Sequence, residues 1–72
     1  MSITKKFGQS VRTARKKLNI SQEELAHNAG VNRSHMGQIE RGAKSPGLTT
    51  IDRIAKALNC SAGQLLEEKT IE

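Results

Sequence analysis

The stretch from 21 to 42, SQEELAHNAGVNRSHMGQIERG, constrains the fold more than any other part of the chain. It holds two short segments, each of which begins at a residue that caps helix starts and ends at a glycine that stops helices. Ser21 and Gly30 bracket the first segment, and Asn32 and Gly42 bracket the second. The sequence therefore predicts two helices of about eight residues joined by a turn of three or four.

The apolar residues of this stretch fall on one side of each expected helix. Leu25, Ala26 and Ala29 face inward in the first, and Met36 and Ile39 in the second, with Val31 holding the second helix against the rest. The pattern Ser-x-x-Glu at Ser21–Glu24 is a capping box, in which each side chain satisfies a free backbone N–H of the other residue.

Helical spacing of apolar residues continues on both sides of this stretch. One apolar stripe precedes it: Ile3, Phe7, Val11, Ala14 and Leu18. Asn19 ends that helix, because Asn tolerates the left-handed conformation. A second stripe follows a loop at Pro46: Leu48, Ile51, Ile54, Ala55 and Leu58. Ser61 caps a short last helix with Leu65 and Leu66. The prediction is a compact all-α domain of five helices over 1–72, with no strand.

Composition narrows the class of protein further. The chain has 72 residues, one cysteine, one Phe and neither Trp nor Tyr, so we expect one domain with an aliphatic core and no internal disulfide. No apolar run approaches the length that spans a membrane, and the basic N-terminus leads into a polar amphipathic stretch, which favours a soluble cytoplasmic protein.

The charge is positive and unevenly distributed. Twelve Lys and Arg against seven Asp and Glu give a net charge of +5, and six of the cations precede Leu18, where there is no acidic residue. The acidic residues Glu67, Glu68 and Glu72 reverse the sign at the C-terminus. This balance suggests a polyanionic partner, either nucleic acid or an anionic membrane surface, although a merely solvated surface has the same composition.

Two short helices joined by a tight turn form the helix-turn-helix arrangement, whose second helix enters the major groove of DNA. With its apolar residues inward, the second helix projects Arg33, Ser34, Gly37 and Gln38 from its other side. Arg matches the O6 and N7 acceptors of guanine, Gln pairs with adenine, and Ser reaches a base edge or a phosphate. The alternative is that these residues are polar surface.

The segment ISQEELAHNAGVNRSHMGQIERG resembles the Cro/C1-type, lambda-repressor-like helix-turn-helix family. LTTIDRIAKALNCSAGQLL is similar to the fourth and fifth helices that complete such domains, at about 48–67, and the helix-turn-helix covers about 22–41. Length and the Asn-Arg-Ser run are most similar to controller proteins of restriction–modification systems or small phage-type repressors. Asn19, where Gly is frequent, and Gly37 inside the second helix depart from the pattern.

The resemblance implies a sequence-specific regulator of transcription that binds double-stranded DNA. It implies base-reading roles for Arg33, Ser34 and Gln38. It implies contacts with the DNA backbone for a second set: Gln22, Asn32, His35, Arg41 and Lys44. In the family, the glutamine at the position of Gln22 sometimes contacts a base as well. For this set capping (Asn32) or solvent exposure (His35, Arg41, Lys44) remains the alternative. The resemblance also implies a mostly buried structural ion pair between Arg15 and Glu40.

An enzyme is the first competing class. Cys60, His27 and His35 match no zinc spacing, and the sequence has neither a phosphate-binding loop nor a site with paired carboxylates. We expect Cys60 to be a small buried residue and His27 to lie on the surface. No catalysis, metal, cofactor or small-molecule ligand is therefore expected.

A protein-interaction module on the same fold, such as an antitoxin-type partner binder, is the second competing class. Such a module would expose an apolar stripe, whereas the second helix of this chain is polar. The large apolar side chains not needed for the core are expected after Ser61, at Leu66 and Ile71. We expect these two to form the interface of a homodimer that binds palindromic half-sites about one helical turn apart. The alternative is that Leu65 and Leu66 both fold back into the core of the monomer.

Overall fold

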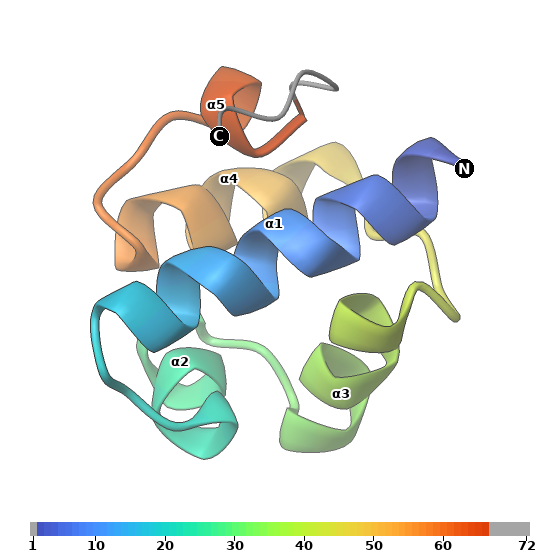
Figure 1. Ribbon diagram of the computed structural model, residues 1–72. Helices are drawn as coiled ribbons and strands as arrows, with labels where there is room; N and C mark the ends of the chain where they lie inside the picture. Colours follow the sequence, from blue (N-terminus) through green and yellow to red (C-terminus); the bar gives the residue numbers. More distant parts are fainter. Residues whose placement is uncertain (1, 67–72) are drawn as a thin grey trace.

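The computed structural model describes residues 2–66, and this part of the chain is all-helical with no strand (Figure 1). Its five helices have these bounds: α1 Ile3–Lys17, α2 Gln22–Ala29, α3 Arg33–Arg41, α4 Leu48–Ala57 and α5 Ala62–Leu66. The all-helical, five-helix fold predicted from the sequence is thus confirmed for the described residues.

Helices α1 to α4 all end by the same mechanism. A residue just past each helix adopts the left-handed conformation, with φ of 62° at Asn19, 68° at Gly30, 75° at Gly42 and 60° at Asn59. The following backbone N–H then bonds back to a carbonyl of the last turn, as Val31 N does to Ala26 O at 2.8 Å. The predicted stop at Asn19 is confirmed, and Asn59 is a second such stop that the sequence analysis missed.

Short polar side chains cap the starts of all the helices except α4, whose N-cap is Gly47. Ser21 Oγ accepts the backbone N–H of Glu24 at 3.0 Å, which is one half of the predicted capping box. The complete box lies at the start of α5 instead, where Gln64 Oε1 accepts from Ser61 N at 2.9 Å and Ser61 Oγ accepts from Gln64 N at 3.1 Å. A Ser-x-x-Gln pattern thus fixes the short last helix.

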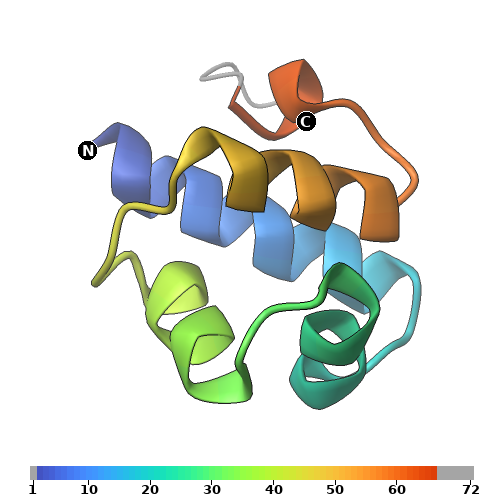
Figure 2. The same cartoon turned by 180° about the vertical axis from the view of Figure 1, so that it is seen from behind.

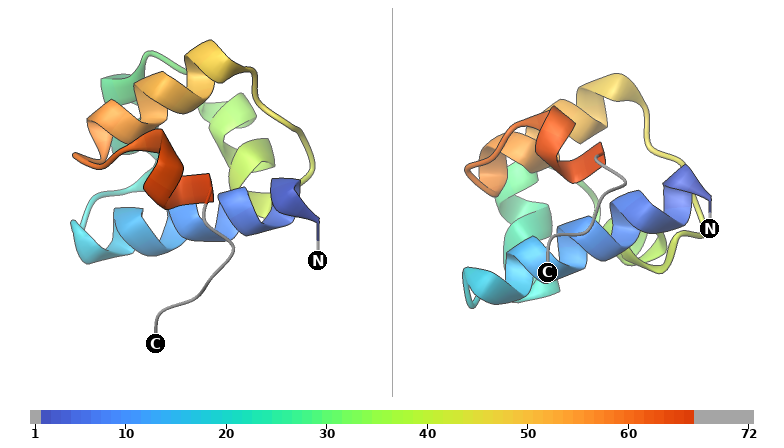
Figure 3. Two further views of the ribbon diagram at one scale, coloured as in Figure 1. Left: turned by 90° about the horizontal axis from the view of Figure 1, so that it is seen from above. Right: turned by 45° about the horizontal axis from the view of Figure 1, so that its top comes forward.

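The helices form two groups around one core (Figures 1 and 2). Helices α2 and α3 lie side by side at one end of the molecule, and α5 covers the gap between α1 and α4 at the other end (Figure 3). The core draws on all five helices: Phe7, Val11, Leu25, Ala26, Ala29, Met36, Ile39, Ile51, Ile54, Ala55, Leu58 and Leu65. The outer surfaces of α2 and α3 therefore lie at one end of the domain, away from α5.

Three residues that the sequence analysis placed in apolar stripes are exposed. Leu48 is 83% exposed, Ile3 59% and Leu18 43%. Each lies at an end of its helix, Ile3 and Leu48 as first residues and Leu18 as the C-cap, where no neighbouring helix covers the side chain. Periodicity predicts the side of the helix on which a residue lies, but it does not predict how far along the helix a neighbouring helix extends. The prediction that these three residues face the core was therefore wrong.

Helix α1 crosses the end of α3 at very short range, and Gly8 makes this possible. A Cβ atom at Gly8 would collide with the carbonyl oxygen of Ile39 and would lie 2.8 Å from that of Glu40. Both atoms are backbone, so the only relief is to move one helix away from the other. Gly8 therefore fixes the position of α3 against the body of the domain.

Candidate nucleic-acid interface

The outer side of α3 carries polar side chains at the positions expected to read bases. Arg33 and Ser34 are exposed and Gln38 is half-buried, while Met36 and Ile39 on the opposite side are buried. Ser34 and Gln38 are four residues apart and so lie one above the other on this side of the helix. Arg33, Ser34 and Gln38 are thus brought together within the first two turns of α3.

These side chains are available to a ligand. Within residues 2–66, the side chains of Arg33, Ser34, Gln38 and Arg41 take part in no hydrogen bond or ion pair. No buried side-chain nitrogen or oxygen in this part of the chain lacks a partner, so the amide of Gln38 reaches solvent. Folding therefore leaves the donors and acceptors of this surface unused.

Asn32 has a structural role in the turn before α3. Its Oδ1 accepts the backbone N–H groups of Ser34 at 2.7 Å and His35 at 3.3 Å, which caps the helix. Only the amide NH₂ of this side chain is left to contact a phosphate. His35 is half-buried on α3, and Lys44 is exposed in the loop after it.

A buried carboxylate holds the inner side of α3. Glu40 Oε2 accepts from Arg15 Nε at 2.7 Å, and Glu40 Oε1 accepts from Arg15 Nη2 at 3.0 Å and from Gln22 Nε2 at 3.2 Å. Arg15 Nη1 also donates to the carbonyl oxygen of Ile20 at 3.0 Å. The ion pair is largely buried, with side chains 13% and 4% exposed. It joins α1, α2 and α3 at one point, and the bond to Gln22 was not expected from the sequence.

Gly37 does not project outward as expected from the sequence but is buried beneath two side chains. A Cβ atom at Gly37 would lie 3.4 Å from both Gln22 Oε1 and Arg41 Nη1. The end of the Gln22 side chain, from α2, and the guanidinium of Arg41, from α3, thus cover the helix backbone there. The helical pattern placed Gly37 outside because it took no account of a side chain from α2.

The residues expected to form a dimer interface are only partly described. Leu66 is half-buried and packs against the core from the end of α5, beside the fully buried Leu65. Ile71 lies outside the described residues. The expectation that spare large apolar side chains occur only after Ser61 was wrong, because Leu48 is far more exposed than Leu66.

The remaining reactive side chains are dispersed. Cys60 is half-buried against the core, and burial raises the pKa of its thiol, which keeps the thiol protonated at neutral pH. His27 is exposed, as expected. The residues that the structure describes contain no cluster of three or more His, Cys, Asp or Glu side chains that could hold a metal ion, and no helix among them is long and apolar enough to cross a membrane.

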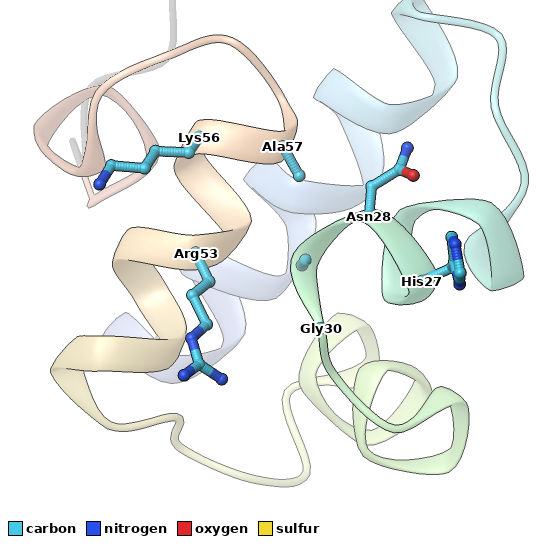
Figure 4. Close-up of a pocket in the computed structure, with 7 residues that line it drawn as sticks. His27, Asn28, Gly30, Arg53, Lys56 and Ala57 are labelled. Carbon is cyan, nitrogen blue, oxygen red and sulfur yellow. The ribbon is translucent and has the colours of Figure 1, made fainter.

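An open hollow of about 430 Å³ lies between the end of α2 and α4. Its basic side chains are His27, Arg53 and Lys56, and Figure 4 shows His27 and Lys56 turned to opposite sides. Lys56 is also paired with Asp52 at 3.2 Å on the same helix. The basic side chains of the hollow are therefore not directed toward a common point. In this respect the hollow differs from the outer side of α3, where Arg33, Ser34 and Gln38 lie close together.

The fold and the surface of α3 together define a helix-turn-helix protein. Helix α3, the second helix of this motif, has a polar outer side on which the side chains of Arg33, Ser34 and Gln38 have no partner within residues 2–66. The helix-turn-helix family model matches residues 11–65. Control protein C.BamHI of Bacillus amyloliquefaciens is 42% identical over 66 residues, which cover 90% of this chain and 82% of that protein. The chain belongs to the Cro/C1-type helix-turn-helix family, whose members are DNA-binding regulators of transcription and not enzymes.

Solved structures show the same fold. The restriction–modification controller protein C.AhdI of Aeromonas hydrophila matches with a TM-score of 0.83 and 39% identity, over 86% of this chain and 94% of that one. The P22 c2 repressor, solved in complex with a synthetic operator, matches with a TM-score of 0.81 and 35% identity, over 88% and 96%. This chain is therefore a DNA-binding transcriptional regulator with a lambda-repressor-like fold.

Proposed function

We propose that this regulator binds a palindromic operator as a homodimer, with α3 of each subunit in the major groove. The observation that carries the proposal is the contrast between the two sides of α3. Its inner side is fixed by the core and by Glu40, whereas the side chains of Arg33, Ser34 and Gln38 on its outer side have no partner within residues 2–66. The two controller proteins and the operator-bound repressor to which the chain is similar support this role.

The base contacts follow from the chemistry of the three side chains. The planar fork of Arg33 suits the O6 and N7 atoms of guanine, and the amide of Gln38 suits adenine. Ser34 is short and reaches a base edge or a phosphate close to the helix. Asn32, His35, Arg41 and Lys44 contact phosphates and set the register of the helix in the groove. The protein acts in the cytoplasm, on DNA, without a cofactor or small-molecule ligand.

Selection of bound sites from a random pool of DNA duplexes tests the proposal. The wild-type protein should select an inverted repeat whose half-sites lie about one helical turn, roughly 34 Å, apart. Arg33→Ala should weaken specific binding about 5- to 150-fold and lose the preference at one symmetry-related pair of positions. An unchanged set of selected sites for this variant would show that α3 is not the reading helix.

The dimer interface is tested separately. We place it at the end of α5, with Leu66 and Ile71. Acidic residues follow Leu66, and a surface turned away from the DNA phosphates tolerates their negative charge. Leu66→Glu should give a folded monomer in sedimentation equilibrium that binds a single half-site weakly. Leu48→Glu is the matched control, since it adds the same charge at the most exposed leucine. A monomer from Leu48→Glu and a dimer from Leu66→Glu would move the interface to the start of α4.

A further inference from the structure

The first turn of α1 lies directly on the turn that follows α3 (Figure 1). A Cβ atom at Gly42 would lie 2.9 Å from the Cα atom of Lys5 and 2.7 Å from its Cγ atom. Gly42 also has a φ of 75°, so a side chain there would be strained as well as crowded. The glycine thus lets the aliphatic stem of Lys5 pack on the backbone at the end of α3.

Two contacts fix the point from which the Lys5 side chain extends. Ser2 Oγ, at the N-cap of α1, accepts the backbone N–H of Lys5 at 3.2 Å. The backbone of Gly42 lies against the Cα, Cβ and Cγ atoms of Lys5. Lys5 is nevertheless an exposed residue, so its ammonium group extends from the Gly42 turn into solvent.

The ammonium group of Lys5 has no anionic partner in the part of the chain that the structure describes. Within residues 2–66 the Lys5 side chain takes part in no hydrogen bond or ion pair, and the first turn of α1 contains no acidic residue. Glu40, at the end of α3, is buried and bound by Arg15. The positive charge of Lys5 is therefore available to an anion from another molecule.

Cations at the end of α3 come from two separate segments. Lys44 follows Gly42 by two residues and is exposed. Arg41 precedes Gly42, but its Nη1 lies 3.4 Å from the place of a Cβ atom at Gly37, so its guanidinium turns back along the helix. Lys5 and Lys44 thus bring charges from α1 and from the loop after α3 to the same turn.

The place of Lys5 favours a phosphate over a base as its partner. Helix α3 has nine residues, which at 1.5 Å per residue separate its two ends by about 13 Å. Arg33 and Ser34 lie at the first end and Lys5 at the other. A lysine ammonium is a compact point charge, which suits a phosphate of the DNA backbone.

We propose that Lys5 contacts a phosphate at the edge of the groove that α3 enters, so that the DNA-binding surface extends beyond the helix-turn-helix onto the first turn of α1. The proposal rests on the proposed function, in which α3 lies in the major groove. The competing role is structural, because a cation beside the C-terminal end of a helix also interacts favourably with the helix dipole.

Lys5→Gln tests the proposal, because it removes the charge and keeps most of the aliphatic stem. The slope of log K against log salt should become shallower by about 0.9, since one phosphate contact is lost. The ratio of wild-type to variant affinity should consequently fall about 3.5-fold between 50 and 200 mM salt. Specific and random duplexes should be affected alike, and the selected sites should not change.

Two further variants serve as controls for this experiment. Lys17→Gln removes the same charge from an exposed lysine at the other end of α1 and should keep the slope of the wild-type protein. Lys5→Arg keeps the charge at the Gly42 turn and should keep that slope as well. The midpoint of urea denaturation should be the same for Lys5→Gln and the wild-type protein.

Other outcomes would overturn the proposal. An unchanged slope with a lower denaturation midpoint would show that Lys5 stabilises the end of α3, and no change in either would show a merely solvated lysine. An equal change of slope for Lys17→Gln would assign the effect to the overall charge, and a lost base preference would show that Lys5 reads a base. In each case an inverted repeat selected by the wild-type protein would leave the proposed function intact, whereas its absence would reject that function.

Discussion

The inner and the outer side of α3 have opposite properties. On the inner side, the backbone of α1 lies in close contact with the backbone of α3 at Gly8. The Glu40 carboxylate there accepts three hydrogen bonds from Arg15 and Gln22. On the outer side, within the described residues, the side chains of Arg33, Ser34 and Gln38 have no partner. The contacts of the inner side fix the position of α3 in the domain, and the side chains of the outer side determine which groups of a ligand it can contact. Substitutions on the inner side should therefore change the free energy of unfolding, and those on the outer side the affinity for DNA.

Glu40→Ala should have the largest effect. It would leave the guanidinium of Arg15, whose side chain is 13% exposed, without its carboxylate partner. Removal of one member of a buried ion pair costs about 3–5 kcal/mol, which is comparable with the whole stability of a small domain. Urea denaturation followed by circular dichroism measures the loss. Arg33→Ala, on the outer side, is the control and should stay within about 0.5 kcal/mol of wild type.

Two glycine substitutions give the next comparison. Gly8→Ala should destabilise the protein by about 1–3 kcal/mol or more, because the new methyl group meets backbone carbonyl groups of α3 that cannot turn aside. Gly37→Ala should instead stabilise it by up to about 1 kcal/mol, because Ala favours helix and the methyl group meets only flexible side-chain ends at 3.4 Å. Equal unfolding free energies for the two variants would show that α1 and α3 are not held at close range.

The sequence predicted the features of α3 that depend on neighbouring residues. Capping residues, stop residues and the alternation of buried and exposed positions are local, and Asn32, Met36 and Ile39 behave as expected. Resemblance to a known family added the pairing of Arg15 with Glu40, residues that no local pattern connects.

The features that the sequence did not predict depend on how helices distant in the chain cross. Gly8 is a mid-helix glycine in a stripe of apolar residues, and only the packing angle between α1 and α3 shows why a side chain cannot fit there. The bond from Gln22 to Glu40 joins residues 18 positions apart. Leu48 fits the apolar period of α4 but lies at its first residue, beyond the reach of neighbouring helices. Such contacts require the three-dimensional arrangement.

On the outer side, Gln38→Ala should reduce specific DNA binding by about 1–3 kcal/mol and relax the preference at the base pair that Gln38 reads. Stability should remain within about 0.5 kcal/mol of wild type, since the amide of Gln38 takes part in no hydrogen bond within residues 2–66. Gln9→Ala is the matched control, because Gln9 is an exposed glutamine of α1. Competition between specific and random duplexes measures the effect, and an equal loss for both duplexes would contradict a base-reading role.

Lys44→Ala should have the smallest effect, and it separates two kinds of contact on the outer side. Lys44 is exposed in the loop after α3, so it can neutralise a phosphate but is not held in the line of side chains that face the bases. Its loss should weaken binding to all duplexes alike and reduce the slope of log K against log salt by about 0.9. Lys17→Ala removes the same charge at an exposed position at the end of α1, outside the helix-turn-helix, and should leave the slope unchanged. If both variants lowered the slope equally, the general positive charge of the chain, rather than a contact beside α3, would account for the salt dependence.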